Sequence, residues 1–126
     1  MVQNLPINSI PPKIWGKSGW TYLFSVCLGY PKKPTKSDRE RYKAFFESMQ
    51  YVIPCSKCRE GYSKDLKTNN IDKYLDSNTK LVTWLIKMVN STLPPNKKIG
   101  NIHDIISKYF RETNLGVKNY LKLIYK

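Results

Sequence analysis

Two of the chain's three cysteines, Cys55 and Cys58, lie two residues apart in the segment YVIPCSKCREGY. Thiols at this spacing can supply half of a zinc site, cycle between a dithiol and a disulfide, or simply be buried. A structural zinc site needs four nitrogen or sulfur ligands, and only Cys27 and His103 remain to complete one. Cys27 falls on an apolar helical face and His103 beside Asp104 near a predicted helix start. We therefore expect packing and surface roles for these two residues and no metal.

The redox interpretation fits the local pattern better. Pro54 suits the first position of a helix, and two cysteines three positions apart in a first helical turn face the same way. The helix dipole stabilises a thiolate on Cys55, and Lys57 and Arg59 add positive charge. Such a thiolate attacks an incoming disulfide, and in reverse its disulfide accepts electrons from substrate thiols. The spacing alone is a weak signal, so an unreactive buried pair stays open.

The elements that must position this pair are helices. Apolar residues recur at helical spacing in five segments, and alternating strand patterns are nearly absent. The predicted helices cover residues 13–30, 35–53, 54–68, 79–93 and 102–113, and their expected inward residues are Trp15, Trp20, Phe24, Cys27, Leu28, Tyr42, Phe45, Phe46, Met49, Val52, Leu81, Trp84, Leu85, Met88, Val89, Ile102, Ile105, Ile106 and Tyr109. Thr35 or Ser37 caps the second helix, and residues 69–78 form a polar connection. We expect an all-α four-helix bundle with a short fifth helix packed across one end.

Length and charge restrict the possible functions. The chain has 126 residues, enough for one domain, and carries 22 Lys and Arg against 9 Asp and Glu, a net charge of +13. Such a surface favours anionic partners, but no helix-turn-helix, zinc-finger or RNA-binding signature accompanies it, so nucleic acid is not expected as the main ligand. No stretch reaches the roughly 20 apolar residues of a membrane span, and the first residues lack a signal-peptide pattern. We expect a cytoplasmic protein.

The aromatic residues Trp20, Phe24, Trp84 and Tyr109 allow two interpretations. They can be plain core, or they can line a site for a planar aromatic cofactor within the bundle. Because the chain shows no βαβ units, it cannot be a thioredoxin-like protein, and a redox-active cysteine pair would need another electron acceptor.

Four motifs in order resemble the Erv/ALR family of FAD-linked sulfhydryl oxidases, over residues 10–113. They are the tryptophan-glycine segment WGKSGW (15–20), the loop YPKKPT (30–35), the aromatic helix end FFESM (45–49) and the redox motif PCSKCREGY (54–62). This resemblance divides the chain into an irregular lead-in (1–9), an oxidase domain (10–113) and a basic tail (114–126), which could be a sixth helix or a docked extension.

The resemblance implies an FAD site. Its contacts would come from Trp15, Gly16, Lys17, Trp20, Phe24, Cys58, Trp84, Asn90, Lys97, Lys98 and Tyr109. Among these, the lysines would meet the pyrophosphate of the cofactor. Two positions depart from the family pattern: Phe24 replaces a histidine, and of the family's HNxVN motif, aligned with residues 89–93, only Asn90 remains.

The same resemblance implies a mechanism and partners. Cys55 would exchange with a dithiol substrate through a mixed disulfide, Cys58 would pass the electrons to FAD, and dioxygen would become hydrogen peroxide. The donor would be a dithiol protein or a small thioredoxin-like carrier, because neither the lead-in nor the tail carries a cysteine. The chain resembles the short viral members of the family, so host cytoplasm, a virus factory or a virion is the expected site, with late expression and a homodimer. The alternatives are an inactive member of the family and a basic nucleic-acid-binding helical module.

Overall fold

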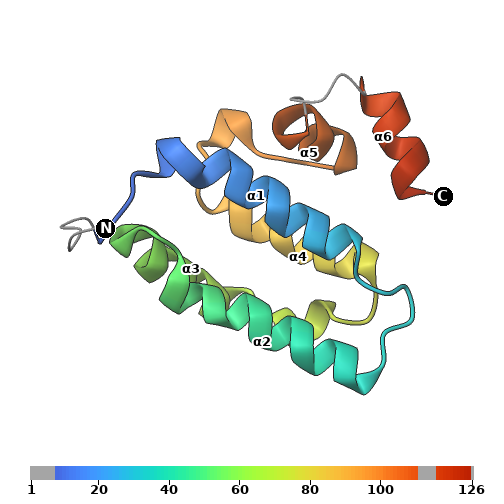
Figure 1. Ribbon diagram of the computed structural model, residues 1–126, viewed down its shortest axis with the longest axis horizontal. Helices are drawn as coiled ribbons and strands as arrows, with labels where there is room; N and C mark the ends of the chain where they lie inside the picture. The colour runs from blue at the N-terminus through green and yellow to red at the C-terminus, as the bar shows by residue number, and fades with distance from the viewer. Residues whose placement is uncertain (1–7, 111–115, 126) are drawn as a thin grey trace, which may run out of the picture.

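The molecule is a bundle of four antiparallel helices with two short helices on one side (Figure 1). The computed structural model describes residues 8–110 and 116–125, and no strand occurs in these ranges. The elements are α1 (Pro12–Leu28), α2 (Lys36–Val52), α3 (Ser56–Thr68), the 3₁₀ turn η1 (Ile71–Tyr74), α4 (Asn78–Asn90), the 3₁₀ turn η2 (Pro95–Lys97), α5 (Ile102–Tyr109) and α6 (Gly116–Ile124). The predicted all-α fold is confirmed. The tail contains a sixth helix, one of the two forms that the sequence left open.

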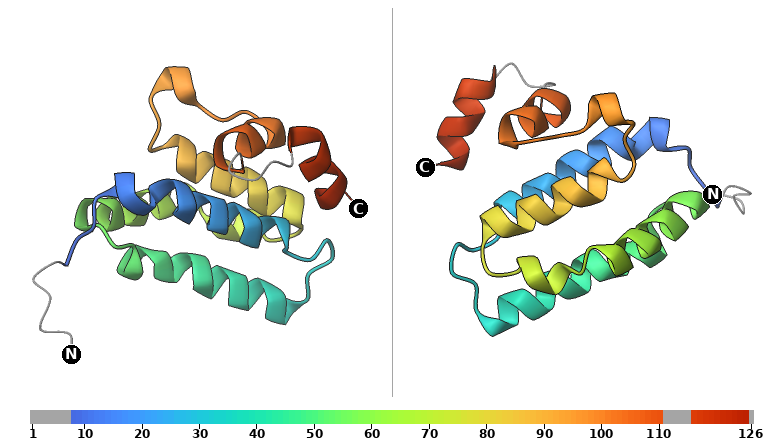
Figure 2. Two further views of the ribbon diagram at one scale, coloured as in Figure 1. Left: turned by 45° about the horizontal axis from the view of Figure 1, so that its top comes forward. Right: turned by 180° about the vertical axis from the view of Figure 1, so that it is seen from behind.

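The alternating helix directions bring four helix ends together. α1 and α3 begin, and α2 and α4 end, at the left side of Figure 1, and both views of Figure 2 agree with this arrangement. We call this side the cysteine end of the bundle, since Cys55 and Cys58 lie there. α1 packs along α4, α2 packs along α3, α5 packs on α1, and α6 packs on α5.

The core is built from the stripe of α4. Its five expected inward residues are all buried, and they are Leu81, Trp84, Leu85, Met88 and Val89. Phe24 and Cys27 of α1 and Phe46 of α2 meet them with no exposed surface. Three of the four expected inward residues of α5 are buried too. On α2 the expectation for Val52 is wrong: it lies in the last turn and is 60% exposed, because the chain bends away towards Cys55 there.

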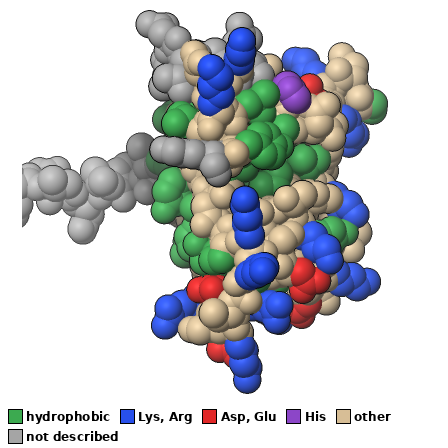
Figure 3. Space-filling model, turned by 90° about the vertical axis from the view of Figure 1, so that its right-hand side faces the viewer, with side chains coloured by type: hydrophobic (Ala, Val, Ile, Leu, Met, Phe, Trp, Pro, Cys, Tyr) green, Lys and Arg blue, Asp and Glu red, His purple; other side chains and the backbone are tan. Residues whose placement is uncertain are grey.

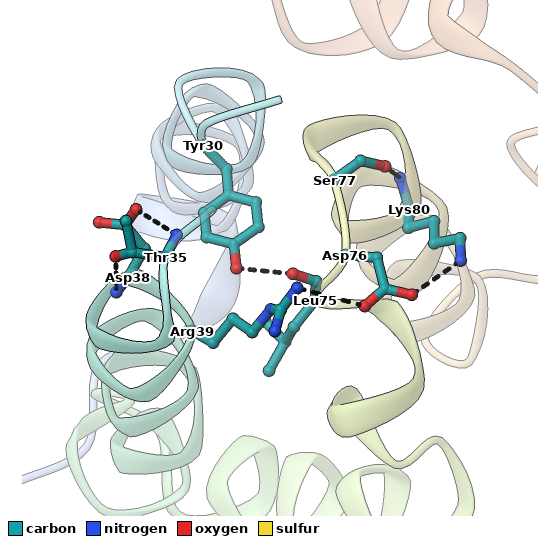
Figure 4. A network of polar contacts seen from close by, with 8 residues as sticks. All are labelled: Tyr30, Thr35, Asp38, Arg39, Leu75, Asp76, Ser77 and Lys80. Atoms are coloured by element: carbon teal, nitrogen blue, oxygen red, sulfur yellow. Dashed lines mark hydrogen bonds and ion pairs between the residues drawn. The ribbon is translucent and has the colours of Figure 1, made fainter. Parts of the chain in front are cut away.

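Polar contacts fix the other end of the bundle (Figure 4). Thr35 caps α2 in a reciprocal capping box with Asp38, as one of the two predicted caps. The buried Tyr30 donates its hydroxyl to the carbonyl of Leu75 at 2.7 Å, which ties the end of α1 to the connection before α4. Asp76 in that connection lies 3.9 Å from Arg39 and 3.0 Å from Lys80.

The connection between α3 and α4 is not merely polar, as the sequence suggested. It contains η1, and Ile71 and Leu75 are buried in the core. A 3₁₀ turn of four residues is too short to show a helical period, so its two apolar anchors were invisible to a pattern search.

One face of the molecule carries an apolar area. In Figure 3, hydrophobic side chains gather in the upper and middle part of the visible face with Lys and Arg around them, and most of the visible acidic side chains lie in the lower half. Leu123 in α6 is 60% exposed, and Tyr125, which directly follows α6, is 70% exposed. Within the described residues, none of the helices has both the length and the apolar character to span a membrane.

Candidate functional site

Cys55 and Cys58 form a disulfide at the start of α3, with their Cα atoms 5.1 Å apart. Cys55 is the N-cap residue of α3, with an extended backbone, and its Sγ accepts a hydrogen bond from the backbone N–H of Cys58 at 3.3 Å. The expected helix start at Pro54 is therefore wrong by two residues. The reason is a tight turn in which Cys55 donates its backbone N–H to the Ile53 carbonyl at 2.8 Å, so the helix cannot begin before Ser56.

The two predicted cations lie differently around the pair. Arg59 donates from Nη1 to the Ile53 carbonyl at 2.6 Å, so its guanidinium is held against the turn that precedes Cys55. Lys57 is exposed to solvent. The pair lies at the N-terminus of α3, and Lys57 and Arg59 belong to the same first turn, so the setting is electropositive and favours a thiolate once the disulfide opens.

The two cysteine residues differ in exposure. Cys55 is buried, with 8% of its surface exposed, whereas Cys58 is half-buried. Tyr62, one turn further along α3, donates its buried hydroxyl to the Phe46 carbonyl of α2 at 2.6 Å. This contact fixes the rotation of α3 relative to α2, and with it the direction in which Cys58 points.

An aromatic group lies beside the middle of α1. The ring of Phe24 stacks on that of Tyr109 at 5.5 Å, and the ring of Trp20 lies 6.5 Å from that of Phe24. Phe24 has no exposed surface and Trp20 is half-buried. Burial raises the pKa of Tyr109 to about 12, so its hydroxyl stays neutral near pH 7.

Beside Tyr109 is a cavity of about 370 Å³, lined by Lys17, Ser18, Thr21, Tyr22, Ser25, Tyr109, Phe110 and Tyr120.

The first turns of α1 hold the remaining residues of the tryptophan-glycine segment. Trp15 is half-buried and donates its indole N–H to the Ile10 carbonyl at 2.8 Å. Gly16 is half-buried too, and Lys17 is exposed at the edge of the cavity. A Cβ added at Gly19 would lie 3.3 Å from the Trp15 ring, so a small residue there lets the indole lie flat against α1.

On α4, the structure gives Trp84 and Asn90 well-defined packing roles. Trp84 has no exposed surface, and its indole N–H donates to the Asn69 carbonyl at 2.8 Å. Asn90 uses both ends of its amide on Ile99: Nδ2 donates to the carbonyl at 2.8 Å, and Oδ1 accepts the N–H at 2.7 Å. Lys98 donates from Nζ to the Asn90 carbonyl at 2.7 Å, and Lys97 is exposed.

The fold brings some of the predicted site residues together. The start of α1, the cysteine pair and Asn90 share the cysteine end, because helix directions alternate (Figure 1). Trp84 lies mid-helix in the core, and Phe24 and Tyr109 meet where α5 packs on α1.

The sequence patterns did not indicate Ser9 and Ile10, which contact the redox loop, because a proline-rich lead-in gives no periodic signal. Across the described ranges, no group of three or more His, Cys, Asp or Glu side chains could hold a metal ion.

Comparison with known proteins gives consistent results. The profile of the Erv1 / Alr family matches residues 17–112. A protein of Acanthamoeba polyphaga mimivirus named probable FAD-linked sulfhydryl oxidase R368 is 45% identical over 80 residues, which cover 63% of this chain and 56% of that protein. The mitochondrial FAD-linked sulfhydryl oxidase ERV1 of Saccharomyces cerevisiae is 30% identical over 91 residues, covering 71% of this chain and 46% of the yeast protein. The chain thus spans about half the length of these relatives.

Among solved structures, the yeast Erv1 core superposes with a TM-score of 0.67 at 20% identity, covering 90% of this chain and 96% of the yeast core. A mutant of Erv1 from Saccharomyces cerevisiae, in which two cysteines are replaced by serine, gives a TM-score of 0.68 at 19% identity, covering 89% of this chain and 100% of the mutant. At this level of identity the similarity establishes the fold.

Proposed function

The chain belongs to the Erv1 / Alr family, and from this premise we propose that it is an FAD-dependent thiol oxidase that forms disulfide bonds in protein substrates. The relatives named above are FAD-linked sulfhydryl oxidases. The observation that carries the proposal is the Cys55–Cys58 disulfide at a helix N-terminus, on the same end of the bundle as the tryptophan-glycine segment.

The residues present fit FAD in part. Lys17, Lys97 and Lys98 are exposed and can neutralise a pyrophosphate, and the half-buried Trp20 and Cys58 have surface to offer a flat ring. Tyr109 borders a cavity, and Trp15 and Gly16 lie within one turn of Lys17. Phe24 and Trp84 have no exposed surface, so we assign them a supporting role from behind the site. Asn90 would act by holding Ile99 and the adjoining lysines in place. When bound, FAD would supply an acceptor for two electrons and a donor to dioxygen, giving hydrogen peroxide.

The cysteine pair would carry out thiol–disulfide exchange. A substrate thiolate attacks Sγ of Cys55, the Cys55–Cys58 bond breaks, and Cys58 leaves as a thiolate. The second substrate thiol, deprotonated, attacks the mixed disulfide, so the substrate leaves oxidised and Cys55 becomes a thiolate. The Cys58 N–H that contacts Sγ of Cys55 and the dipole of α3 stabilise this charge. The Cys55–Cys58 pair is then reduced and holds the two electrons, and Cys58, which is half-buried, offers the surface through which they can leave.

The partners follow from the same proposal. The electron donor would be a dithiol protein or a small thioredoxin-like carrier that meets Cys55 directly, since Cys27 is buried and lies outside the exchange. We also propose a homodimer through α1 and α2, because four of the large exposed apolar side chains lie on these helices: Ile14, Tyr22, Tyr51 and Val52. Since relatives occur in mimivirus and an iridescent virus, we propose that it works in the host cytoplasm, a virus factory or a virion.

Oxygen consumption with dithiothreitol tests the activity. Wild-type protein incubated with FAD should turn over, whereas Cys55→Ser and Cys58→Ser should each abolish turnover, since each leaves a single thiol in the pair. Cys27→Ser is the matched control and should keep most of the activity, because the Cys27 side chain is fully buried and outside the exchange. Wild-type protein that binds FAD but consumes no oxygen would instead indicate an inactive member of the family.

A further inference from the structure

A short segment before α1 lies directly along the redox loop. The hydroxyl of Ser9 accepts a hydrogen bond from the backbone N–H of Ser56 at 3.2 Å. The backbone N–H of Ile10 donates to the carbonyl of Pro54 at 2.6 Å. These two partners are the neighbours of Cys55 on either side, so the segment passes beside Cys55 and is attached both before and after it.

A third hydrogen bond holds the same segment from α1. The indole N–H of Trp15 donates to the Ile10 carbonyl at 2.8 Å. Both backbone polar groups of Ile10 are therefore satisfied, one by the redox loop and one by Trp15. The segment is fixed between α1 and the start of α3, although it has no regular secondary structure.

The position of this segment conflicts with free access to Cys55. Thiol–disulfide exchange requires the attacking sulfur to reach the sulfur of Cys55, and the rate depends on that access. Only 8% of the Cys55 surface is exposed, whereas Cys58, which lies one turn further along α3, is half-buried. In the state that the structure shows, the cysteine assigned to receive the substrate is the more covered of the two.

We propose that residues 8–11 form a strap that covers Cys55 and must open before a substrate thiol can attack, with Ser9 and Trp15 as the positioning residues that keep it closed. The inference rests on the proposed function for the role of Cys55. In the open state a substrate thiolate bonds to Sγ of Cys55 and displaces the Cys58 thiolate, as in the exchange described above. The strap would slow reaction with small thiols in general and favour partners that displace it.

The test measures how fast the Cys55–Cys58 disulfide opens in the full chain. The protein is mixed with excess dithiothreitol without oxygen, quenched with acid at intervals and alkylated, and its thiols are counted by mass. Ser9→Ala removes the acceptor of one strap hydrogen bond, and Trp15→Phe removes the donor of another while keeping an aromatic ring. Each variant should open its disulfide about fivefold faster than wild type, because the loss of one net hydrogen bond shifts the equilibrium between the closed and the open strap by about that factor.

Three controls separate the strap from a loss of folding. Ser9→Thr retains the hydroxyl and should restore the wild-type rate. Ser107→Ala, at an exposed serine on α5 away from the redox loop and the cavity, should leave the rate unchanged. In a separate sample alkylated without the acid quench, while the chain is folded, Cys27 should stay unmodified in every variant, since it is buried in the core.

The proposal is overturned if Ser9→Ala and Trp15→Phe both stay within about twofold of Ser107→Ala, below the effect of one hydrogen bond. It is also overturned if their faster opening comes with alkylation of Cys27, because the cause is then general loosening. Disulfide opening by dithiothreitol needs no flavin, so protein that never binds FAD would contradict the proposed oxidase activity and leave this test intact.

Discussion

At the scale of single residues, the redox pair depends on a buried phenol one helical turn away from the chemistry. Tyr62 donates to the Phe46 carbonyl at 2.6 Å and has 6% of its surface exposed. Tyr62→Phe leaves that carbonyl without its buried partner, so the free energy of unfolding should fall by about 1.5 kcal/mol. Urea unfolding followed by circular dichroism measures the change.

The matched control is Tyr51→Phe, on the neighbouring α2. Tyr51 is 76% exposed, and water replaces any contact of its hydroxyl, so its unfolding free energy should stay near that of wild type. Equal effects of the two substitutions would show that the Tyr62 hydroxyl does not anchor α3 to α2.

The buried thiol of Cys27 should make the free energy of unfolding fall at alkaline pH. Burial raises the pKa of its thiol above the ordinary value of 9.0, so the folded protein keeps the proton while the unfolded chain loses it. The contribution of this thiol to the free energy of unfolding is fully present below pH 9.0, the ordinary pKa of the group, and is lost progressively as the pH rises above it. Between about pH 8 and about pH 10 the loss should reach about 1.4 kcal/mol, and Cys27→Ala should remove this part of the decline. Urea unfolding at both pH values checks it, and parallel declines in the two proteins would contradict it.

At the scale of elements, the link from α4 to α5 depends on one side chain. Asn90 holds Ile99 by two hydrogen bonds of 2.8 and 2.7 Å, and Ile99 is 5% exposed. Asn90→Ala should lower the free energy of unfolding by about 2 kcal/mol, about 1 kcal/mol for each bond. Asn90→Asp keeps the acceptor for the Ile99 N–H but sets a carboxylate oxygen against the Ile99 carbonyl, so it should be destabilising too. The control is Asn96→Ala in η2, which is exposed and should change little; a similar loss there would contradict the role of Asn90.

Helix existence could be predicted from sequence better than helix ends. The stripe of α4 has enough periodic residues to fix its buried face, and Thr35 is a strong cap that places the start of α2. The start of α3 was misplaced because Pro54 favours a first helical position, whereas the structure uses Cys55 itself as the N-cap. Cysteine is not a usual cap, so local preference gave no hint.

The candidate site was predictable only where motif order defines it. The four motifs identify Cys55 and Cys58 and the start of α1, because their residue types and spacing are specific. They do not show that the amide of Asn90 is occupied by Ile99, or that Ser9 reaches Ser56. Such contacts join segments far apart in the chain or lie in irregular segments, and a single sequence carries no record of them.

At the scale of the whole molecule, exposed apolar side chains on α1 and α2 predict self-association. Tyr22 is 63% exposed on α1, and a charge placed in a buried interface is costly. Light scattering after size exclusion should give a dimer for wild type and mainly monomer for Tyr22→Asp. Tyr125→Asp, at a residue 70% exposed directly after α6, is the control and should remain dimeric. A monomeric wild type would remove the basis for this interface.

The central claim is that Cys55 and Cys58 pass electrons from a dithiol to a flavin held by this bundle. The most direct measurement is the visible spectrum of purified protein, incubated with FAD and freed of excess, during addition of dithiothreitol without oxygen. The account predicts a yellow wild type that loses its colour rapidly, and a Cys58→Ser variant that is equally yellow but keeps its colour far longer. A wild type that stays colourless after FAD, or a variant that bleaches as fast as wild type, would contradict the account.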